Sequence, residues 1–273
     1  MNSCAFVAAV PESGRSGRAS VKTASSVARL GDGFAERRGF EIESVHTPVR
    51  RHSANQLLKD RYAWRGYHSV RLPDGLSGSH FSLSATRDGK TIGTMTVGFE
   101  NPYTLSCEDA FAQEVHALRM SGRRLCEFTR LAVEPGTGTQ AVLAALFHVS
   151  YIVAHRLRGM DTLLMEVNPR HVRYYERMLG ARVFGSVRTN AKVNAPAVLL
   201  GIEFEYVKAQ IERCAWRAEV APNERSLYSL AFTQQEEDGI AARLKTPQPE
   251  RVDKRPPFSF RLPTWRTRSL LES

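Results

Sequence analysis

The sequence predicts a single α/β domain whose central mixed sheet is flanked by helices, with irregular segments at both termini. Three observations support this prediction. The Asp88-Gly89-Lys90 turn separates two runs typical of strands and indicates a hairpin. Two short apolar runs, 125–133 and 161–169, flank a long helical segment that is apolar on nearly every side. Because a crossover of that length joins parallel strands, the sheet is expected to be mixed.

The expected elements follow one another without long interruptions. The apolar residues of 54–67 recur at helical spacing, and the hairpin strands occupy 80–87 and 91–100. The remaining elements are a helix over 106–124, a strand over 125–133, a Gly-rich turn over 134–139, a helix over 140–157, a strand over 161–169, a helix over 169–179 that stops at Gly180, and strands over 181–188 and 197–207.

Composition divides the chain into three parts. Residues 1–53 are rich in Ser, Ala, Gly and Arg, with few large apolar side chains, and are expected to be disordered. Residues 54–213 carry the α/β domain. Residues 214–273 are expected to form an extension, with room for one helix over 226–244 before an irregular, basic, Pro-rich tail.

The formal charge of +10 is spread along the chain, with +3, +5 and +2 in residues 1–60, 61–213 and 214–273. No helix-turn-helix, zinc-finger or aromatic RNA-binding pattern accompanies it, so no nucleic-acid partner is predicted. An acidic protein or a carboxylate substrate suits the same excess of positive charge.

The four cysteines are scattered and form no CxxC pattern, so the sequence predicts neither a metal site nor a disulfide framework. A reducing cytoplasm is therefore the expected compartment. No apolar run approaches the ~20 residues of a membrane span, so no span is predicted. Peripheral membrane association through a lipid product is left open.

The stretch LCEFTRLAV, residues 125–133, places Glu127 and Arg130 inside an otherwise apolar strand. Buried charge is costly unless it is paired or belongs to a site, and we interpret these two residues as facing a cavity. A spacing of three does not put both side chains on one face of a regular strand. A bulge or splay near Phe128 and Thr129 is therefore predicted. A structural ion pair at a sheet edge is the alternative.

Two motifs resemble those of GNAT-fold acyltransferases. They are EFTRLAVEPGTGTQAVLAALF (127–147) and NPRHVRYYERMLGARVFG (168–185), the second being similar to the Asn…Tyr-Glu-Lys-Leu-Gly-Phe segment of that fold. Within the superfamily, the Glu127 and Arg130 pair resembles the Glu-x-x-Arg of acyl-homoserine-lactone synthases. The region from about 57 to 208 is most similar to long-chain N-acyl amino acid synthases of the FeeM type.

This resemblance implies an enzyme that transfers a fatty acyl group from acyl carrier protein to the amine of an amino acid, by direct attack in a ternary complex. It implies acyl carrier protein as partner and co-substrate, with acyl-CoA left open, and no tightly bound cofactor or metal. Acetyl-CoA users carry a basic or amide residue where this chain has Glu134, which disfavours a pyrophosphate donor. An acyl-homoserine-lactone synthase and a non-catalytic GNAT-like binding module are the alternatives.

Acyl transfer to an amine needs a base, a cation for the substrate carboxylate and a proton for the thiolate. Glu127 is the expected base, since desolvation raises the pKa of a carboxyl group. Arg130 is expected to hold Glu127 or the substrate carboxylate. The resemblance assigns Tyr175 to the thiolate, although a tyrosine in this helix is equally compatible with simple packing.

The remaining candidates bind substrate or donor. The substrate group is Arg61, Trp64, Phe128, Thr129, Leu131 and Val133, and the donor phosphopantetheine group is Gly136, Gly138, Thr139 and Asn168. Asn168 also suits a helix N-cap, and Arg61 also suits a solvated helix face. Met95, Phe111, Leu118 and Met120 line either an acyl tunnel or the ordinary core.

Overall fold

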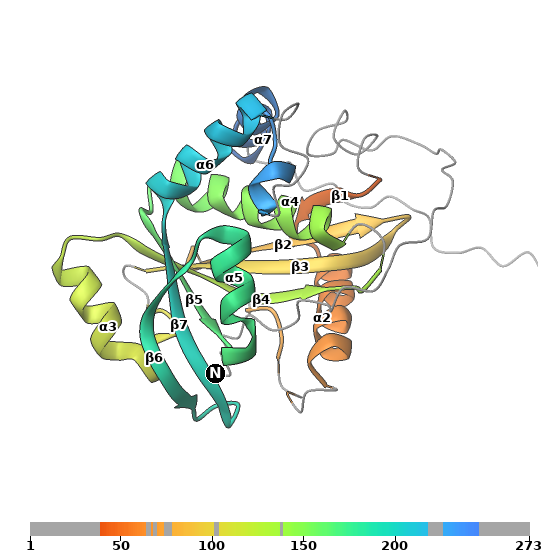
Figure 1. The fold of residues 1–273 in the computed structure, drawn as a ribbon. Coiled ribbons are helices and arrows are strands. Elements are labelled where there is room, and N and C mark those ends of the chain that lie inside the picture. The colour runs from red at the N-terminus through yellow and green to blue at the C-terminus, as the bar shows by residue number, and fades with distance from the viewer. Residues whose placement is uncertain are drawn as a thin grey trace, which may run out of the picture.

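The strands pair in one mixed sheet, in the order β1-β2-β3-β4-β5-β7-β6 (Figure 1). The computed structural model describes residues 39–63, 67, 70–73, 78–100, 104–136, 139–217 and 226–245. Its strands are β1 Glu41–Ser44, β2 His80–Arg87, β3 Lys90–Phe99, β4 Leu125–Val133, β5 Thr162–Val167, β6 Arg182–Asn190 and β7 Ala195–Glu203. Neighbouring strands are antiparallel except β4 and β5, which are parallel as predicted.

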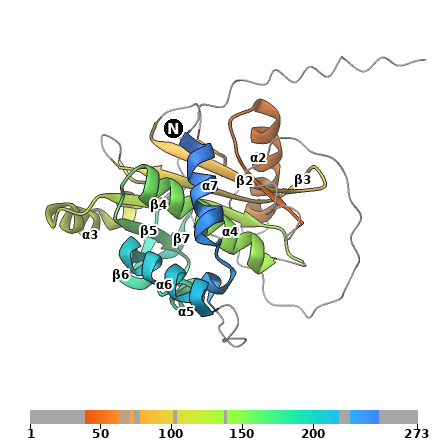
Figure 2. The ribbon, with the colours of Figure 1, turned by 90° about the horizontal axis from the view of Figure 1, so that it is seen from above.

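Helices cover both faces of the sheet (Figures 1 and 2). They are α2 Pro48–Ala63, α3 Glu108–Met120, α4 Thr139–Tyr151, the π-helix η1 Ile152–Leu157, the 3-10 helix η2 Pro169–His171, α5 Val172–Leu179, α6 Phe204–Arg217, the 3-10 helix η3 Leu227–Leu230 and α7 Gln234–Lys245. One buried cluster joins the sheet to α4, α5, α6, η3 and α7. A second joins the opposite face to α2 and α3. We name these the α4 face and the α2/α3 face.

Local sequence signals explain two of the turns. Asp88 and Gly89 both have positive φ, 50° and 76°, as the hairpin between β2 and β3 requires. Gly180 has φ 68° and ends α5, and its amide N–H bonds to the carbonyl of Glu176 at 3.0 Å. The hairpin and the end of this helix are therefore both confirmed.

The ordered region begins before the expected boundary at residue 53. β1 pairs with β2 from Glu41 to Ser44, and Ile42 buries its side chain in the α4-face cluster. The helix expected over 54–67 starts at Pro48, because proline suits the first turn of a helix and lacks only an N–H that would have no partner there. The expectation of disorder up to residue 53 was thus wrong for residues 41–53.

The expected strand over 197–207 and the domain end at 213 also need correction. β7 ends at Glu203, and α6 continues to Arg217. Phe204, Val207 and Ile211 recur at helical spacing and pack on the α4 face, so burial selects a helix. The extension then provides η3 and α7, which agrees with the helix expected within 226–244.

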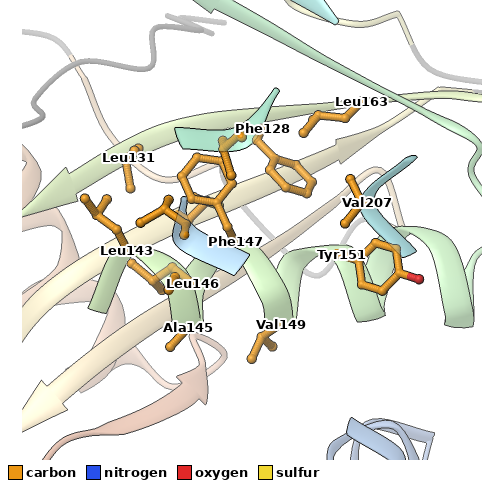
Figure 3. Packing of buried hydrophobic residues seen from close by; sticks show 14 of the residues in the cluster. Phe128, Leu131, Leu143, Ala145, Leu146, Phe147, Val149, Tyr151, Leu163 and Val207 are labelled. Carbon is orange, nitrogen blue, oxygen red and sulfur yellow. The ribbon is translucent and has the colours of Figure 1, made fainter. Parts of the chain in front are cut away.

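The segment Thr139–Leu157, formed by α4 and η1, is long and apolar enough to cross a membrane on composition alone. However, 72% of the apolar window is buried inside the fold. This helix forms the centre of the α4 face, where its side chains meet those of β4, β5 and α6 (Figure 3). Core packing accounts for its hydropathy.

A buried polar contact holds α7 against α4. His148 Nδ1 accepts the Phe232 N–H at 3.0 Å, so its Nε2–H donates to Glu237, at 3.1 Å. Arg156 of η1 also donates to Glu237, at 2.9 Å. Burial alone raises the pKa of the Glu237 carboxyl, but these donors and the Arg156 charge hold that pKa below its ordinary value.

Two glycine-to-alanine substitutions are expected to have opposite effects on stability. A Cβ at Gly180 would lie 2.3 Å from the Tyr206 hydroxyl in a left-handed conformation, so Gly180→Ala should cost about 1 kcal/mol or more. A Cβ at Gly239, inside α7, meets nothing within 4 Å, so Gly239→Ala should stabilise by up to about 1 kcal/mol. Urea unfolding measures both free energies. Equal effects would contradict the assigned backbone geometry.

Glu237→Gln is expected to destabilise the protein by about 1–3 kcal/mol at neutral pH, since it removes a buried charged acceptor from two donors. The native pKa of Glu237 is depressed, so its contribution is present above the unfolded-state value of about 4.3 and is lost as pH falls through the native value. Unfolding free energies of both proteins from pH 7 downward should therefore converge. A difference that stays constant with pH would contradict this.

Candidate active site

Strand β4 contains a bulge. Thr96 pairs with Thr129 and Thr94 with Ala132, so Arg130 and Leu131 lie opposite a single residue of β3. Arg130 has φ 51°, a left-handed conformation rare for residues with a side chain. Beyond the bulge the alternation of faces is shifted, which brings Arg130 to the same side as Glu127. The predicted bulge is confirmed.

Strands β4 and β5 also separate. Their parallel pairing runs from Leu125 and Thr162 to Glu127 and Leu164, while both strands continue further. We name the opening beyond Glu127 and Leu164 the fork. There, β4 and β5 no longer pair, so the backbone N–H and C=O groups along their facing edges are not bonded to each other. This leaves an opening between the two faces of the sheet. One arm leads through the Gly-rich turn into α4, and the other leads into η2 and α5.

Glu127 lies at the mouth of the fork with 2% of its surface exposed. Its Oε2 accepts the Cys107 N–H at 3.1 Å. Opposite on β3, a Cβ at Gly98 would come within 2.9 Å of the Glu127 Cγ, so glycine there leaves room for the carboxyl. Burial raises the pKa of Glu127, against hydrogen bonds from Ser106 and Cys107 and the weaker effect of the Arg130 charge.

Arg130 is buried as well, with 2% of its surface exposed. Its Nε donates to the Arg71 carbonyl at 2.6 Å, and its Nη1 donates to the Thr129 hydroxyl at 3.0 Å. Burial and the Arg130 charge together lower the pKa of His80 to about 4. His80 is therefore neutral at pH 7, mainly because it is buried.

Glu166 of β5 is a second buried carboxyl at the fork, and sequence reasoning missed it. It pairs with Leu199 and Glu127 pairs with Leu164, and both leucines belong to the α2/α3-face cluster. The two carboxyl groups therefore share that face. Burial, with a contribution from the Glu127 charge, raises the pKa of Glu166 to about 8. A charge inside an apolar strand, the signal that marked Glu127, was also present here.

Three of the donor residues named from the resemblance, Gly136, Thr139 and Asn168, follow the two arms of the fork. Thr139 donates from its hydroxyl to the Gly136 carbonyl at 2.7 Å and so closes the turn, while Gly138 lies outside the described residues. Lys90 Nζ lies 2.8 Å from Glu134 Oε2, and this ion pair offsets the negative charge of Glu134 at the turn. Asn168 accepts the Arg170 N–H at 3.2 Å and is the N-cap of η2.

Tyr175 is fully buried on the α4 face, with its ring 6.3 Å from that of Phe147. Glu127 lies on the other face, so the sheet lies between the two side chains. The adjacent Tyr174 ring stands edge-on to it at 5.4 Å. Tyr174 Oη is buried without a hydrogen-bond partner in the described part of the chain, and burial raises its pKa to about 12.

The substrate candidates divide between the two faces. Phe128, Leu131 and Val133 lie on the α4 face, and Phe128 meets Phe147 there (Figure 3). Arg61 of α2 has a buried Nε without a hydrogen-bond partner among the described residues. Trp64 lies outside the described residues.

The four residues named for an acyl tunnel do not line one channel. Met95 lies in the α4-face cluster and Phe111 in the cluster on the opposite face. Leu118 is only partly buried against that second cluster, and Met120 is 74% exposed. A narrow apolar cavity of ≈ 30 Å³ instead lies on the α4 face, among side chains of α4, α6 and η3, with Phe128 of β4 and Leu163 of β5 on its sheet side.

Four arginines occupy the outer side of α5 and its flanks. Arg170, Arg173, Arg177 and Arg182 are exposed, and within the described residues none of them forms an ion pair. We name them the α5 arginine surface. Because η2 directly follows β5, this surface begins at the open end of the fork.

Comparison with known proteins agrees with this architecture. The structure of FeeM, an N-acyl amino acid synthase from uncultured soil microbes, matches with a TM-score of 0.55 and 22% identity over 62% of this chain and 93% of that one. The acyl-homoserine-lactone synthase LasI matches with a TM-score of 0.45 and 16% identity over 60% and 89% of the two chains. No curated protein matches the chain.

The family model described as N-acyl amino acid synthase FeeM matches residues 53–203, more than half of the chain. That segment contains the bulge, the fork, both buried carboxyl groups and α5. The chain is an acyltransferase, and it belongs to the FeeM N-acyl amino acid synthase family.

Proposed function

We propose that this enzyme joins a fatty acyl chain, delivered as a thioester on acyl carrier protein, to the amine of an amino acid. The observation that carries the proposal is a carboxyl group, Glu127, buried at the mouth of the fork with a raised pKa. A base in that position meets the chemical requirement of amide formation, because an ammonium group must lose a proton before it attacks a thioester.

Glu127 accepts the proton of the amine, directly or through one water molecule. Its raised pKa makes the carboxylate a stronger base than an ordinary glutamate. Its bonds from the Ser106 and Cys107 segment hold the carboxylate in one orientation. Activity that depends on this base rises as pH increases through the pKa of the group.

Arginine supplies the cation for the carboxylate of the amino acid. Arg61 carries a buried Nε without a hydrogen-bond partner among the described residues, which favours an anionic ligand. Arg130 lies three residues after Glu127 and on the same face of the sheet. Its Nε and Nη1 already donate hydrogen bonds to the Arg71 carbonyl and the Thr129 hydroxyl. We assign the substrate carboxylate to Arg61 and the shaping of the site to Arg130.

Direct attack on the thioester is favoured over an acyl-enzyme intermediate. Two buried cysteines lie beside Glu127, Cys107 and Cys126, and burial followed by the charge of Glu127 raises the pKa of both thiols. A nucleophilic cysteine requires the opposite, a thiolate stabilised by positive charge. Both substrates are therefore expected on the enzyme together.

The donor arm enters the fork, where backbone groups of β4 and β5 are released to bond its amides. Gly136, Thr139 and Asn168 border its path, and Gly138 is retained as a donor candidate from the sequence motif. The thiolate also needs a proton donor, and Tyr175 is one candidate, on the α4 side. The cavity of ≈ 30 Å³ marks where side chains must move apart to admit the acyl tail.

Acyl carrier protein is favoured over coenzyme A as donor on electrostatic grounds. The carrier is acidic and presents one phosphodiester, and the α5 arginine surface offers four exposed guanidinium groups beside the fork. The Gly-rich turn instead carries Glu134, already paired with Lys90. A pyrophosphate at the turn would meet this carboxylate.

The first test compares lipid extracts from cells that express wild type, Glu127→Gln or Glu237→Gln, by mass spectrometry. Glu237→Gln is the control, because it neutralises an equally buried carboxyl outside the fork. N-acyl amino acids should appear with wild type and control and fall at least ~100-fold with Glu127→Gln. Acylated lactones instead of amino acids would identify a lactone synthase. No new acylated amine, with folded protein present, would overturn the proposed reaction.

A second test addresses the donor. Arg173→Glu together with Arg177→Glu should lower kcat/KM with acyl carrier protein by roughly tenfold or more. Added salt should also lower the kcat/KM of the wild type with this donor. The same acyl group on free pantetheine should react unchanged. Lys59→Glu, an exposed charge reversal on α2, is the control. Equal losses with both donors would rule out carrier docking at this surface.

A further inference from the structure

Glu166 presents a buried oxygen at the fork that no described residue satisfies. Its Oε1 accepts the Asn190 amide at 2.6 Å, whereas Oε2 is buried without a hydrogen-bond partner among the described residues. The whole residue is 3% exposed. An unsatisfied buried polar atom costs roughly 1–3 kcal/mol, so this oxygen is available to a partner from outside the described residues.

The orientation of Asn190 locates the proton of this carboxyl group. Asn190 Oδ1 accepts the Lys192 N–H at 2.9 Å, so the amide nitrogen faces Glu166 and donates to Oε1. Oε1 is therefore the acceptor oxygen. When Glu166 is protonated, the hydrogen lies on Oε2, the oxygen that has no hydrogen-bond partner in the described part of the chain.

The two carboxyl groups at the fork are not equivalent. Ser106 and Cys107 donate to Glu127, which favours its ionised form. Glu166 receives the Asn190 amide on one oxygen and faces the charges of Glu127, Asp109 and Lys192, the first two raising and the third lowering its pKa. The thiol of Cys107 also faces the pair. Burial, reinforced by the charge of Glu127, raises the pKa of Glu166 to about 8 and so favours its protonated form at neutral pH.

We propose that Glu166 is the general acid of the acyl transfer and donates its Oε2 proton to the departing thiolate. The proposal rests on the proposed function. The amine, neutral after its ammonium proton has passed to solvent, bonds through nitrogen to the thioester carbon and gives one further proton to Glu127, the carbon–sulfur bond breaks, and the sulfur takes the Glu166 proton. Transfer of a proton from Glu127 to Glu166 then restores the pair, so the products are an amide and a free thiol.

The position of Glu166 fits this role. It lies two residues beyond Leu164, the last β5 residue that pairs with β4, so it stands in the part of β5 that borders the opening. The rigid pairing with β7 at Leu199 fixes its backbone. An acid whose pKa is about 8 is matched to proton transfer near neutral pH, and the buried Tyr174 hydroxyl, with a pKa of about 12, is matched less well. Two carboxyl groups with separated pKa values divide the roles of base and acid.

The experiment measures thiol release by the purified full chain from two dodecanoyl thioesters, with a mixture of the twenty common amino acids as acceptor. One thioester carries pantetheine, and the other carries a thiophenol, whose more acidic thiol leaves without help. Wild type, Glu166→Gln, Tyr175→Phe and the control Glu237→Gln are compared. Circular dichroism confirms that each protein is folded.

Glu166→Gln should lower kcat with the pantetheine thioester by ~100-fold or more, and by less than ~10-fold with the thiophenol thioester. In the wild type, kcat should decline as pH rises through about 8, because Glu166 must be protonated to act as an acid. Glu166→Gln should abolish this decline. The control Glu237→Gln should retain wild-type kcat with both thioesters and the decline with pH. If Glu166 had only a structural role, Glu166→Gln would lower kcat equally with both thioesters.

Different outcomes separate failure of this inference from failure of the proposed function. A wild-type protein that releases no thiol overturns both. An active wild type with equal losses in Glu166→Gln for both thioesters, or with the selective loss in Tyr175→Phe instead, overturns the general acid only. The infrared carbonyl band of a protonated carboxyl at pH 7 should vanish in Glu166→Gln and persist in Glu237→Gln. A carbonyl band that persists in Glu166→Gln would also overturn the proposal that Glu166 is the general acid.

Discussion

The separation of β4 from β5 is the constraint on which the site depends. Two adjacent parallel strands in the middle of a sheet normally bond along their whole length, and here they stop after Glu127 and Leu164. The bulge at Arg130 bends β4 away and shifts its alternation. The two helices that border the opening, α4 and α5, follow β4 and β5 in the chain. A change that restored the ladder would therefore close the path through the sheet and bury the carboxyl groups against backbone.

Buried carboxyl groups oppose folding, and this chain keeps two of them on the same sheet face. Glu127 is compensated by donors from Ser106 and Cys107, and Glu166 only partly by Asn190. The remainder of the domain offsets that cost through two apolar clusters, one on each side of the sheet. A rigid scaffold around a locally unfavourable site is typical of enzymes, because electrostatic strain at the reacting groups is useful only if the site cannot relax.

The C-terminal elements extend the domain beyond the part that matches the family model. α6, η3 and α7 all follow residue 203 and pack on α4 and η1. Phe204 and Val207 fill the space beside Phe128 and Phe147, so these elements complete the wall behind the fork. The His148, Glu237 and Arg156 contact then fixes α7 in place. The extension is thus continuous with the core that supports the active site.

The sequence by itself determined the parallel pairing, the hairpin and the bulge, because each depends on local spacing: a long buried crossover, an Asp-Gly turn, and charges three residues apart. Only the tertiary structure decided which side chains meet. Glu166 joins Glu127 through strand register, Tyr175 lies across the sheet from both, and Phe204 begins a helix because burial overrides a strand-like pattern. Register and burial arise from contacts between segments distant in the chain, which local spacing does not encode.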